Sequence, residues 1–474
     1  MVFSSVTFLT IFLPLVAGLY YLPSLFLKNS KKLLTIFKNS ILCVSSLVFY
    51  AWGEPKNIIL MLLSIVFNYV IALHMEKTEN CRSRKCLMIF AVIFNIGLLF
   101  FFKYSGFVAD NILMIPGIDF SYVDPALPVG ISFYTFQILS YVIDVYRQKV
   151  CVQRNILNFA LYISMFPQLI AGPIVQYSDI DSQLSERNET LSAVTEGIFI
   201  FVIGLAKKSV LANAAGSVFE SLTGAGFDNL SMLGAWIAII FYAFQIYFDF
   251  SGYSDMAKGL GGIFGFSFPD NFMHPYVATS ITDFWRRWHI TLSSWFRDYV
   301  YIPLGGNRCS KKRHIFNLLI VWSLTGLWHG ASWNFVLWGI YYFILLVLEK
   351  YVFGKIIEKI PLFLRRIITF VFVLFGWVLF ASTDFTMIIS FFSTLFGFNG
   401  IIDNNSVFIF WSNALLLIIM GVCSTELFNL SEFRLLKKNE VRIISRFVLS
   451  VLLFTVSLIC LIGDTYNPFL YFRF

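Results

Sequence analysis

The stretch IFNLLIVWSLTGLWHGASWNFVLWGIYYFILLVL, residues 315–348, has no charged side chain over its whole length. As one helix it would be roughly 51 Å long, at about 1.5 Å per residue. The hydrocarbon core of a bilayer is roughly 30 Å thick. The stretch is therefore too long for one crossing and too short for two complete crossings. Basic residues flank both ends, which assigns both to the cytoplasmic side. We predict a hairpin of two short helices, with its turn at residues 329–332.

The remainder of the chain is also suited to lipid. Of its 474 residues, 58% are hydrophobic and 13% are charged, whereas soluble domains carry about 25% charged residues. A water-soluble fold is therefore excluded. Further apolar runs lie at 5–23, 39–53, 57–75, 87–102, 128–146, 155–174, 192–212, 231–250, 367–382, 406–425 and 444–463. We predict an all-α polytopic membrane protein with about 11–13 transmembrane or re-entrant helices.

The distribution of charge predicts the orientation of this protein. The net charge of +8 does not indicate nucleic-acid binding, because the basic residues cluster in loops rather than along one face. Most Lys and Arg residues fall in the segments 28–38, 76–86, 284–314, 349–366 and 434–446. Positive residues accumulate on the cytoplasmic side of membrane proteins. These five segments are therefore assigned to the inside, and both termini to the extracytoplasmic side.

The charge pattern does not fix the path of the chain between residues 155 and 284. Lys207 and Lys208 favour a cytoplasmic end for their helix, yet the next helix must then exit before the basic loop at 284. The intervening stretch from Gly252 to Phe268 is short and rich in glycine. Irregular backbone in a membrane is tolerated where it is buried in protein or lines a cavity. We predict a re-entrant or broken helix in this region.

His329 is the first candidate catalytic residue. An imidazole titrates near pH 6.5 when unperturbed and serves as a general base or nucleophile. Gly326 and Gly330 leave space for a substrate beside it, and Trp328 and Trp333 are suited to excluding water. The structural alternative is a histidine held by a hydrogen bond at a contact between helices. The hairpin places His329 deep in the membrane or towards the outer face.

His289 is the second candidate, and it lies on the cytoplasmic side of the predicted topology. Trp285 belongs to the same aromatic helix, and Arg286 and Arg287 are suited to the phosphates of a nucleotide-bearing donor. The alternative is an amphipathic helix whose arginines anchor it to anionic lipid headgroups. The pattern by itself favours the anchor.

Asp249 and Asp255 lie in the sequence FDFSGYSD, residues 248–255, at the end of an apolar run. Two carboxylates in this position are suited to orienting a histidine or lining a polar tunnel. Alternatively, they cap the start of a following helix. We expect no metal site, because no cluster of metal-ligating residues occurs at a suitable spacing.

Motifs along nearly the whole chain resemble those of the membrane-bound O-acyltransferase superfamily, in particular its bacterial polysaccharide O-acetylation branch of the alginate O-acetylase type. They are MVFSS (1–5), FFKYSGF (101–107), LPVGISFYTFQILSYVIDVYR (127–147), FPQLIAGPI (166–174), YFDFSGYSDMAKGLGGIFGF (247–266), FWRRWHITLSSWFRDYVYIPLGGNR (284–308), GLWHGASWNFVLWG (326–339) and FLYFRF (469–474). The resemblance implies one domain over residues 1–474, with a ring of helices around a funnel-like core that contains a tunnel. One departure is Asn213, where relatives commonly carry an acidic residue after the Lys-Lys pair.

The resemblance also implies roles for individual residues. The near-invariant catalytic histidine of the superfamily matches His329, and its second histidine matches His289. We assign Trp328 and Asn334 to a donor-binding or tunnel site, together with the Trp285, arginine and aspartate candidates above. An acyl group would pass from a cytoplasmic donor to an extracytoplasmic acceptor. A hydrolase-like extracytoplasmic partner protein with a Ser-His-Asp site is then expected to complete transfer to the sugar.

The resulting functional hypothesis is O-acetylation of an extracytoplasmic polysaccharide, with acetyl-CoA as donor substrate and no permanently bound cofactor. Two alternatives remain at this stage. The same machinery would serve D-alanyl transfer onto teichoic acid from a carrier protein. A polysaccharide exporter or scaffold would instead need polar residues along a wide path, but most mid-helix positions are Phe, Leu and Ile.

Overall fold

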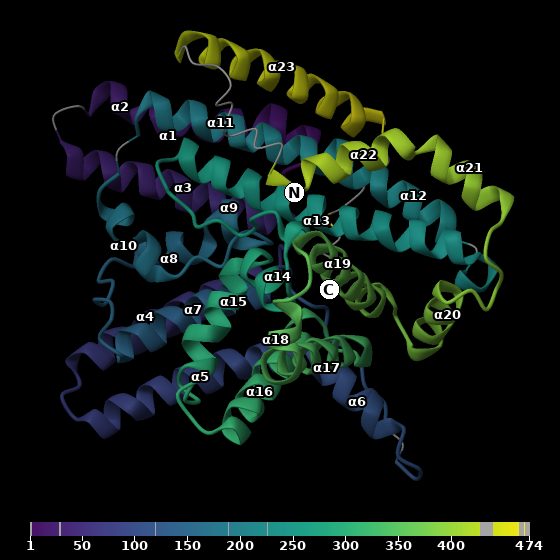
Figure 1. Ribbon diagram of the computed structural model, residues 1–474. Coiled ribbons are helices and arrows are strands. Elements are labelled where there is room, and N and C mark those ends of the chain that lie inside the picture. The colour runs from purple at the N-terminus through teal and green to yellow at the C-terminus, as the bar shows by residue number, and fades with distance from the viewer. Residues whose placement is uncertain are drawn as a thin grey trace. The chain divides into compact units, whose positions relative to one another are not determined.

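The computed structural model describes residues 2–27, 30–118, 120–187, 189–224, 226–426, 439–463 and 469. Within these ranges the regular structure is entirely helical (Figure 1). The chain divides into two compact units. Unit 1 comprises residues 1–201 and 253–269, and unit 2 comprises residues 202–252 and 270–474. The terminal motif at 470–474 and residues 434–438 of the last basic segment lie outside the described residues.

Unit 1 holds the helices of the N-terminal part of the chain. They are η1 (Phe8–Phe12), α1 (Leu13–Tyr21), α2 (Pro23–Phe26), α3 (Lys31–Gly53), α4 (Ile58–Lys77), α5 (Cys81–Lys103), α6 (Ser105–Leu113), α7 (Ile131–Tyr146), α8 (Ile156–Ser164), α9 (Phe166–Leu169) and α10 (Tyr177–Ser185). Within this unit α3 packs against α1 and α8, and α5 packs against α4 and α7. Two helices, α11 (Leu191–Ala206) and α13 (Met232–Ile263), contribute residues to both units.

Unit 2 holds the remaining helices and both histidine motifs. They are η2 (Lys207–Ala212), α12 (Asn213–Thr223), η3 (Phe227–Asn229), η4 (Pro275–Val277), α14 (Ile281–Arg287), α15 (Ile290–Phe296), η5 (Arg297–Tyr301), α16 (Lys311–His329), α17 (Trp333–Leu348), η6 (Glu349–Phe353), α18 (Gly354–Ile357), α19 (Leu362–Ala381), α20 (Phe385–Leu395), α21 (Asn404–Ser412), α22 (Ala414–Cys423) and α23 (Asn439–Gly463). Its hydrophobic core runs from α12 and α13 through α14 to α17 and α19.

Nine helical segments among the described residues are long and apolar enough to cross a membrane, and the bent pair α21 and α22 would make a tenth. They are Phe8–Phe26, Lys31–Gly53, Ile58–Lys77, Cys81–Lys103, Leu191–Thr223, Met232–Ile263, Trp333–Ile357, Leu362–Ala381 and Ile443–Gly463. The prediction of an all-α polytopic membrane protein is confirmed. Two predicted segments are shorter than a full span: 128–146 contains the 16-residue α7, and 155–174 divides into α8 and α9.

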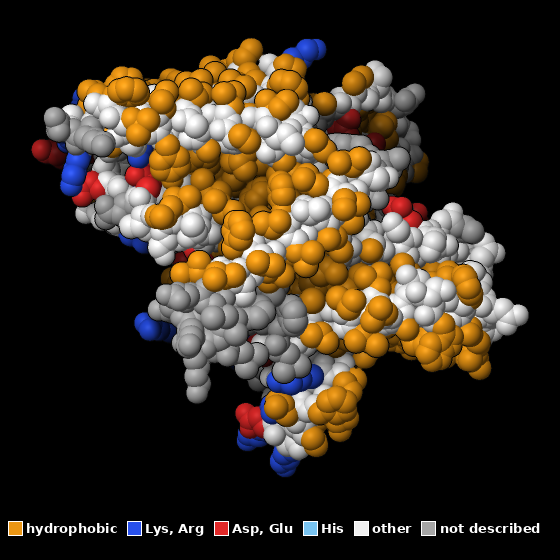
Figure 2. Space-filling model, turned by 90° about the horizontal axis from the view of Figure 1, so that it is seen from above, with side chains coloured by type: hydrophobic (Ala, Val, Ile, Leu, Met, Phe, Trp, Pro, Cys, Tyr) orange, Lys and Arg blue, Asp and Glu red, His pale blue; other side chains and the backbone are white. Residues whose placement is uncertain are grey.

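The surface is hydrophobic over wide areas, as expected for helices that face lipid. Figure 2 shows hydrophobic side chains across much of the visible face, with charged side chains gathered at a few places. On α23, Ile443, Phe447 and Ile462 are 66%, 69% and 72% exposed. Soluble proteins rarely expose apolar surface on this scale, whereas helices that face the hydrocarbon core of a bilayer do. The protein is a multi-pass membrane protein.

The predicted hairpin at 315–348 is confirmed. Helix α16 ends at His329, residues 330–332 form the turn, and α17 begins at Trp333. The second arm is longer than predicted, because helical structure continues through η6 and α18 to Ile357. The two arms approach closely at two glycines. A Cβ atom at Gly326 would overlap the carbonyl oxygen of Phe335, and one at Gly339 would overlap that of Trp322.

The predicted re-entrant or broken helix between Gly252 and Phe268 is wrong for residues 252–263, which belong to α13, whereas residues 264–268 are irregular as predicted. Helix α13 continues without interruption to Ile263, and irregular backbone begins only after it. The glycines serve helix packing instead: a Cβ atom at Gly259 would overlap backbone atoms of Gly197 and Phe201 on α11. Small residues permit close approach of helix backbones in membranes, where interhelical packing replaces the hydrophobic effect.

Candidate active site

His329 lies at the C-terminal end of α16 and is 5% exposed. Aromatic rings surround it: the centroids of Trp338, Trp328 and Phe380 lie 5.0, 5.1 and 5.3 Å from the imidazole centroid. Trp338 belongs to α17 and Phe380 to α19, so three helices enclose this histidine. A nearly dry aromatic surrounding strengthens electrostatic interactions and limits hydrolysis of a reactive acyl group.

His289 lies between α14 and α15, with its backbone in the left-handed region at φ 45° and ψ 53°. Few residues other than glycine adopt this conformation readily. The conformation turns the chain between the two short helices. It brings the buried imidazole against Phe250 of α13, at 4.7 Å between ring centroids.

The protonation state of His289 follows from its partner, Asn271. The Nδ1 atom of His289 lies 3.1 Å from Oδ1 of Asn271. The same oxygen accepts hydrogen bonds from the backbone N–H and the hydroxyl of Thr291 at 3.3 and 2.9 Å. The backbone N–H can only donate, so this atom is the amide oxygen and His289 donates through Nδ1. The proton then resides on Nδ1, and Nε2 carries a lone pair.

This tautomer leaves His289 with an available acceptor. Burial lowers the pKa of His289 to about 3, so the imidazole is neutral at physiological pH. Its Nε2 atom is buried and forms no hydrogen bond within the part of the chain that the structure describes. A neutral imidazole with a free lone pair can accept a hydrogen bond or a proton from a ligand.

The two histidines flank a single side chain, Trp328. The Trp328 ring centroid lies 5.8 Å from that of His289 and 5.1 Å from that of His329. The imidazole centroids are therefore no more than about 11 Å apart. The predicted topology places the two residues at different depths of the membrane. In the structure they belong to one aromatic cluster in unit 2.

The other candidates from the α14 region have different surroundings. The Trp285 ring is buried against Trp322 at 4.8 Å and Tyr342 at 4.8 Å, so it is part of the core. Arg286 is exposed. Arg287 donates from Nε to Asp283 at 2.9 Å and from Nη1 to Glu426 at 3.3 Å. Two carboxylates already hold Arg287, which leaves Arg286 as the better candidate for a phosphate.

Asn334 and Asp249 hold helices together. The Asn334 side chain contacts Ser332 in the hairpin turn and donates to the carbonyl of Leu379 on α19 at 3.4 Å. It thereby fixes the turn that follows His329.

Asp249 pairs with Lys208 at 2.6 Å, and both side chains are 3% exposed. Lys208 therefore has a carboxylate partner on α13, although Asn213 stands where relatives commonly carry an acidic residue.

The alternative interpretation of Asp249 and Asp255 as caps of a following helix is wrong, because both residues lie inside the continuous α13. Asp255 belongs to unit 1 and is half-buried. Lys208 lies in the π-helical turn η2, where the extra residue shifts the side chains that follow.

The comparison with known families agrees with this geometry. The model of the MBOAT, membrane-bound O-acyltransferase family matches residues 147–392, which include both histidines. The chain belongs to the membrane-bound O-acyltransferase family. It is therefore an O-acyltransferase.

Three relatives show what this membrane-bound O-acyltransferase is similar to. It is 38% identical to the probable alginate O-acetylase AlgI of Pseudomonas aeruginosa, over 84% of this chain and 75% of the relative. It is 36% identical to the peptidoglycan O-acetyltransferase of Helicobacter pylori, over 85% of this chain and 81% of the relative. Identity to the teichoic acid D-alanyltransferase of Streptococcus thermophilus is 29%, over 47% of this chain and 56% of the relative.

Several residues around the candidate site were not singled out from the sequence. Asn271 orients His289 from 18 residues upstream, and Trp338 and Phe380 enclose His329 from other helices. Glu349 accepts hydrogen bonds from the backbone N–H groups of Ile281 at 2.7 Å and Thr282 at 3.2 Å. These contacts join residues that are far apart in the sequence, so no local motif predicts them.

Proposed function

We propose that this O-acyltransferase moves an acetyl group from acetyl-CoA at the cytoplasmic face to O-acetylate an extracytoplasmic polysaccharide, with His329 as the catalytic residue. The observation that carries the proposal is the pairing of His329 and His289 around Trp328 in one buried aromatic cluster. Acetyl is favoured over D-alanyl because similarity to O-acetylating relatives extends over about five-sixths of the chain. Similarity to a D-alanyltransferase extends over about half.

In the proposed reaction, His329 accepts the proton of the acceptor hydroxyl. The hydroxyl oxygen bonds to the acetyl carbonyl carbon while the carbon–sulfur bond of the thioester breaks, and the proton passes to the departing CoA sulfur. In a two-step variant, His329 itself carries the acetyl group between donor and acceptor. The neutral His289 accepts a hydrogen bond through Nε2 and orients the donor, and the exposed Arg286 binds its phosphates.

The proposal extends to the surroundings of the enzyme. Basic loops face the cytoplasm and both termini lie outside. A hydrolase-like extracytoplasmic partner receives the acetyl group and completes its transfer to the polysaccharide. The positive-inside distribution of Lys and Arg supports the orientation.

The test is to measure alkali-labile acetate on the surface polysaccharide of cells that carry wild type or His329→Ala at equal membrane levels. Loss of acetate in the variant supports acetyl transfer through His329. Unchanged acetate refutes it, and a parallel loss of D-alanyl ester would favour the teichoic acid reaction. Arg286→Ala is compared with Arg287→Ala at limiting donor. A rise in the KM for acetyl-CoA in Arg286→Ala alone supports the phosphate contact.

A further inference from the structure

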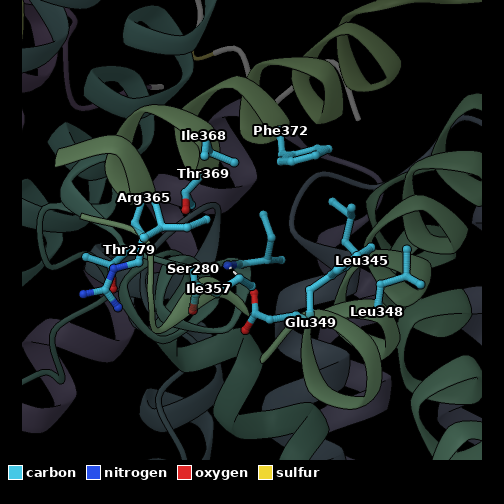
Figure 3. Close-up of a pocket in the computed structure, with 13 residues that line it drawn as sticks. Thr279, Ser280, Leu345, Leu348, Glu349, Ile357, Arg365, Ile368, Thr369 and Phe372 are labelled. Atoms are coloured by element: carbon cyan, nitrogen blue, oxygen red, sulfur yellow. Dashed lines mark hydrogen bonds between the residues drawn. The ribbon is translucent and has the colours of Figure 1, made fainter. Parts of the chain in front are cut away.

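A cavity of about 160 Å³ lies in unit 2, outside the histidine cluster. Its walls are the start of α14, the end of α17 with α18, and the first half of α19 (Figure 3). Leu345 and Leu348 lie on one side of the view, and Ile368 and Phe372 on another. An engineered apolar cavity of about 150 Å³ binds benzene. This cavity is therefore large enough for roughly six carbon atoms of a hydrocarbon chain.

Two charged side chains line the otherwise apolar cavity, and their situations differ. The carboxylate of Glu349 is occupied by the two backbone N–H groups at the start of α14. The Nε atom of Arg365 is buried, and the Arg365 side chain forms no hydrogen bond or ion pair among the described residues. In Figure 3 the guanidinium group lies away from Glu349, on the side of Thr279. A half-buried guanidinium without a partner favours an anionic ligand.

The charge around the cavity agrees with such a ligand. Residues 349–366 contain five basic and two acidic side chains, a net charge of +3. The basic character of this segment predicts that it lies on the cytoplasmic side, where the leaflet is rich in anionic lipids. The shared feature of these lipids is a phosphate directly beside hydrocarbon chains. The cavity offers the same combination, with a guanidinium beside an apolar space.

We propose that this cavity binds an anionic phospholipid, with part of one acyl chain between α17 and α19 and the phosphate on Arg365. The lipid is a bound ligand rather than a substrate, so the proposal goes beyond acyl transfer. Thr279 and Ile281 line the cavity at the start of α14, and α14 leads directly to His289. The bound lipid therefore supports the helix that positions this histidine.

The test measures lipid binding to purified, delipidated protein by native mass spectrometry, with phosphatidylglycerol and phosphatidylcholine as probes. Wild type is expected to retain one phosphatidylglycerol in preference to phosphatidylcholine. Arg365→Gln should weaken retention about tenfold, because charge-assisted hydrogen bonds to the phosphate are lost. The control is Arg366→Gln, which removes an exposed charge at the next position and should leave retention unchanged.

A second pair of variants tests the acyl chain without altering charge. Leu348→Trp fills the cavity and should abolish retention, whereas Ile344→Trp, on the exposed face of the same helix, should not. Equal loss in both arginine variants would mean nonspecific attraction and overturn the proposal. Equal retention of the two lipids, or full retention by Leu348→Trp, would also overturn it. No readout depends on transferase activity, so failure of the proposed reaction is distinguished from failure here.

Discussion

The ion pair between Lys208 and Asp249 gives a prediction whose magnitude follows from burial. The two charged groups lie 2.6 Å apart, each side chain is 3% exposed, and the Phe469 ring lies 4.8 Å from the Lys208 ammonium. Removing one partner of such a pair leaves a buried charge without compensation, at a cost of about 3–5 kcal/mol. Replacing both partners with apolar residues removes both charges and costs much less. We expect Lys208→Met and Asp249→Leu each to destabilise the protein strongly.

The assay is unfolding of purified protein in mixed micelles with increasing dodecyl sulfate, for wild type, both single variants and the double variant. The double variant should be less destabilised than the sum of the two singles by at least about 2 kcal/mol. If the two losses simply add, the residues do not act as a buried pair. The ion pair between η2 and α13 would then contribute nothing measurable to the free energy of unfolding.

Three further predictions concern the surroundings of the site. Glu349→Gln should destabilise α14 by about 1 kcal/mol and reduce transferase activity, because the carboxylate stabilises two N-terminal N–H groups. Glu358→Gln, at an exposed position, should have no effect in the same unfolding and activity assays. Burial lowers the folded-state pKa of His289 to about 3 from an unfolded value near 6.5, so the unfolded state binds more protons between these values. Stability should therefore fall as the pH drops below 6.5, by about 2 kcal/mol between pH 7 and 5, and this part of the slope should vanish in His289→Asn. Gly339→Ala should destabilise the hairpin by about 1–3 kcal/mol, since the new methyl group overlaps the Trp322 carbonyl.

Each of these predictions has an outcome that contradicts it. Equal behaviour of the two glutamate variants would remove Glu349 from any role in positioning α14. An unchanged pH slope in His289→Asn would show that this imidazole titrates normally. A Gly339→Ala protein with wild-type stability would show that α16 and α17 can separate freely at that point.

The hairpin could be predicted because its evidence is local. The length of the uncharged run and its basic flanks together restrict residues 315–348 to two antiparallel arms. The prediction of irregular backbone was wrong for residues 252–263 for a physical reason: glycine lowers helix propensity, but in α13 it also allows close packing on α11. Sequence alone does not distinguish these two uses of glycine, since the second depends on a neighbouring helix.

The candidate site could also be predicted only in part. His289, His329 and Trp328 stand out as polar or aromatic groups at unusual positions, and the structure brings them together. The interpretation of Arg287 as a phosphate ligand overlooked Asp283, four residues earlier and on the same helical face. The contact of Asn271 with His289 could not be foreseen, because the left-handed turn that creates it is not encoded in a recognisable motif.

The left-handed backbone at His289 decides how substitutions at this position should be read. Alanine there removes the imidazole but keeps the Cβ atom in the same unfavourable conformation, without the contact to Asn271 that holds it, so lost activity would mix two causes. Glycine removes the same imidazole and relieves the backbone instead. A glycine variant that is more stable than wild type and yet inactive would show that this enzyme trades stability for chemistry at a single residue.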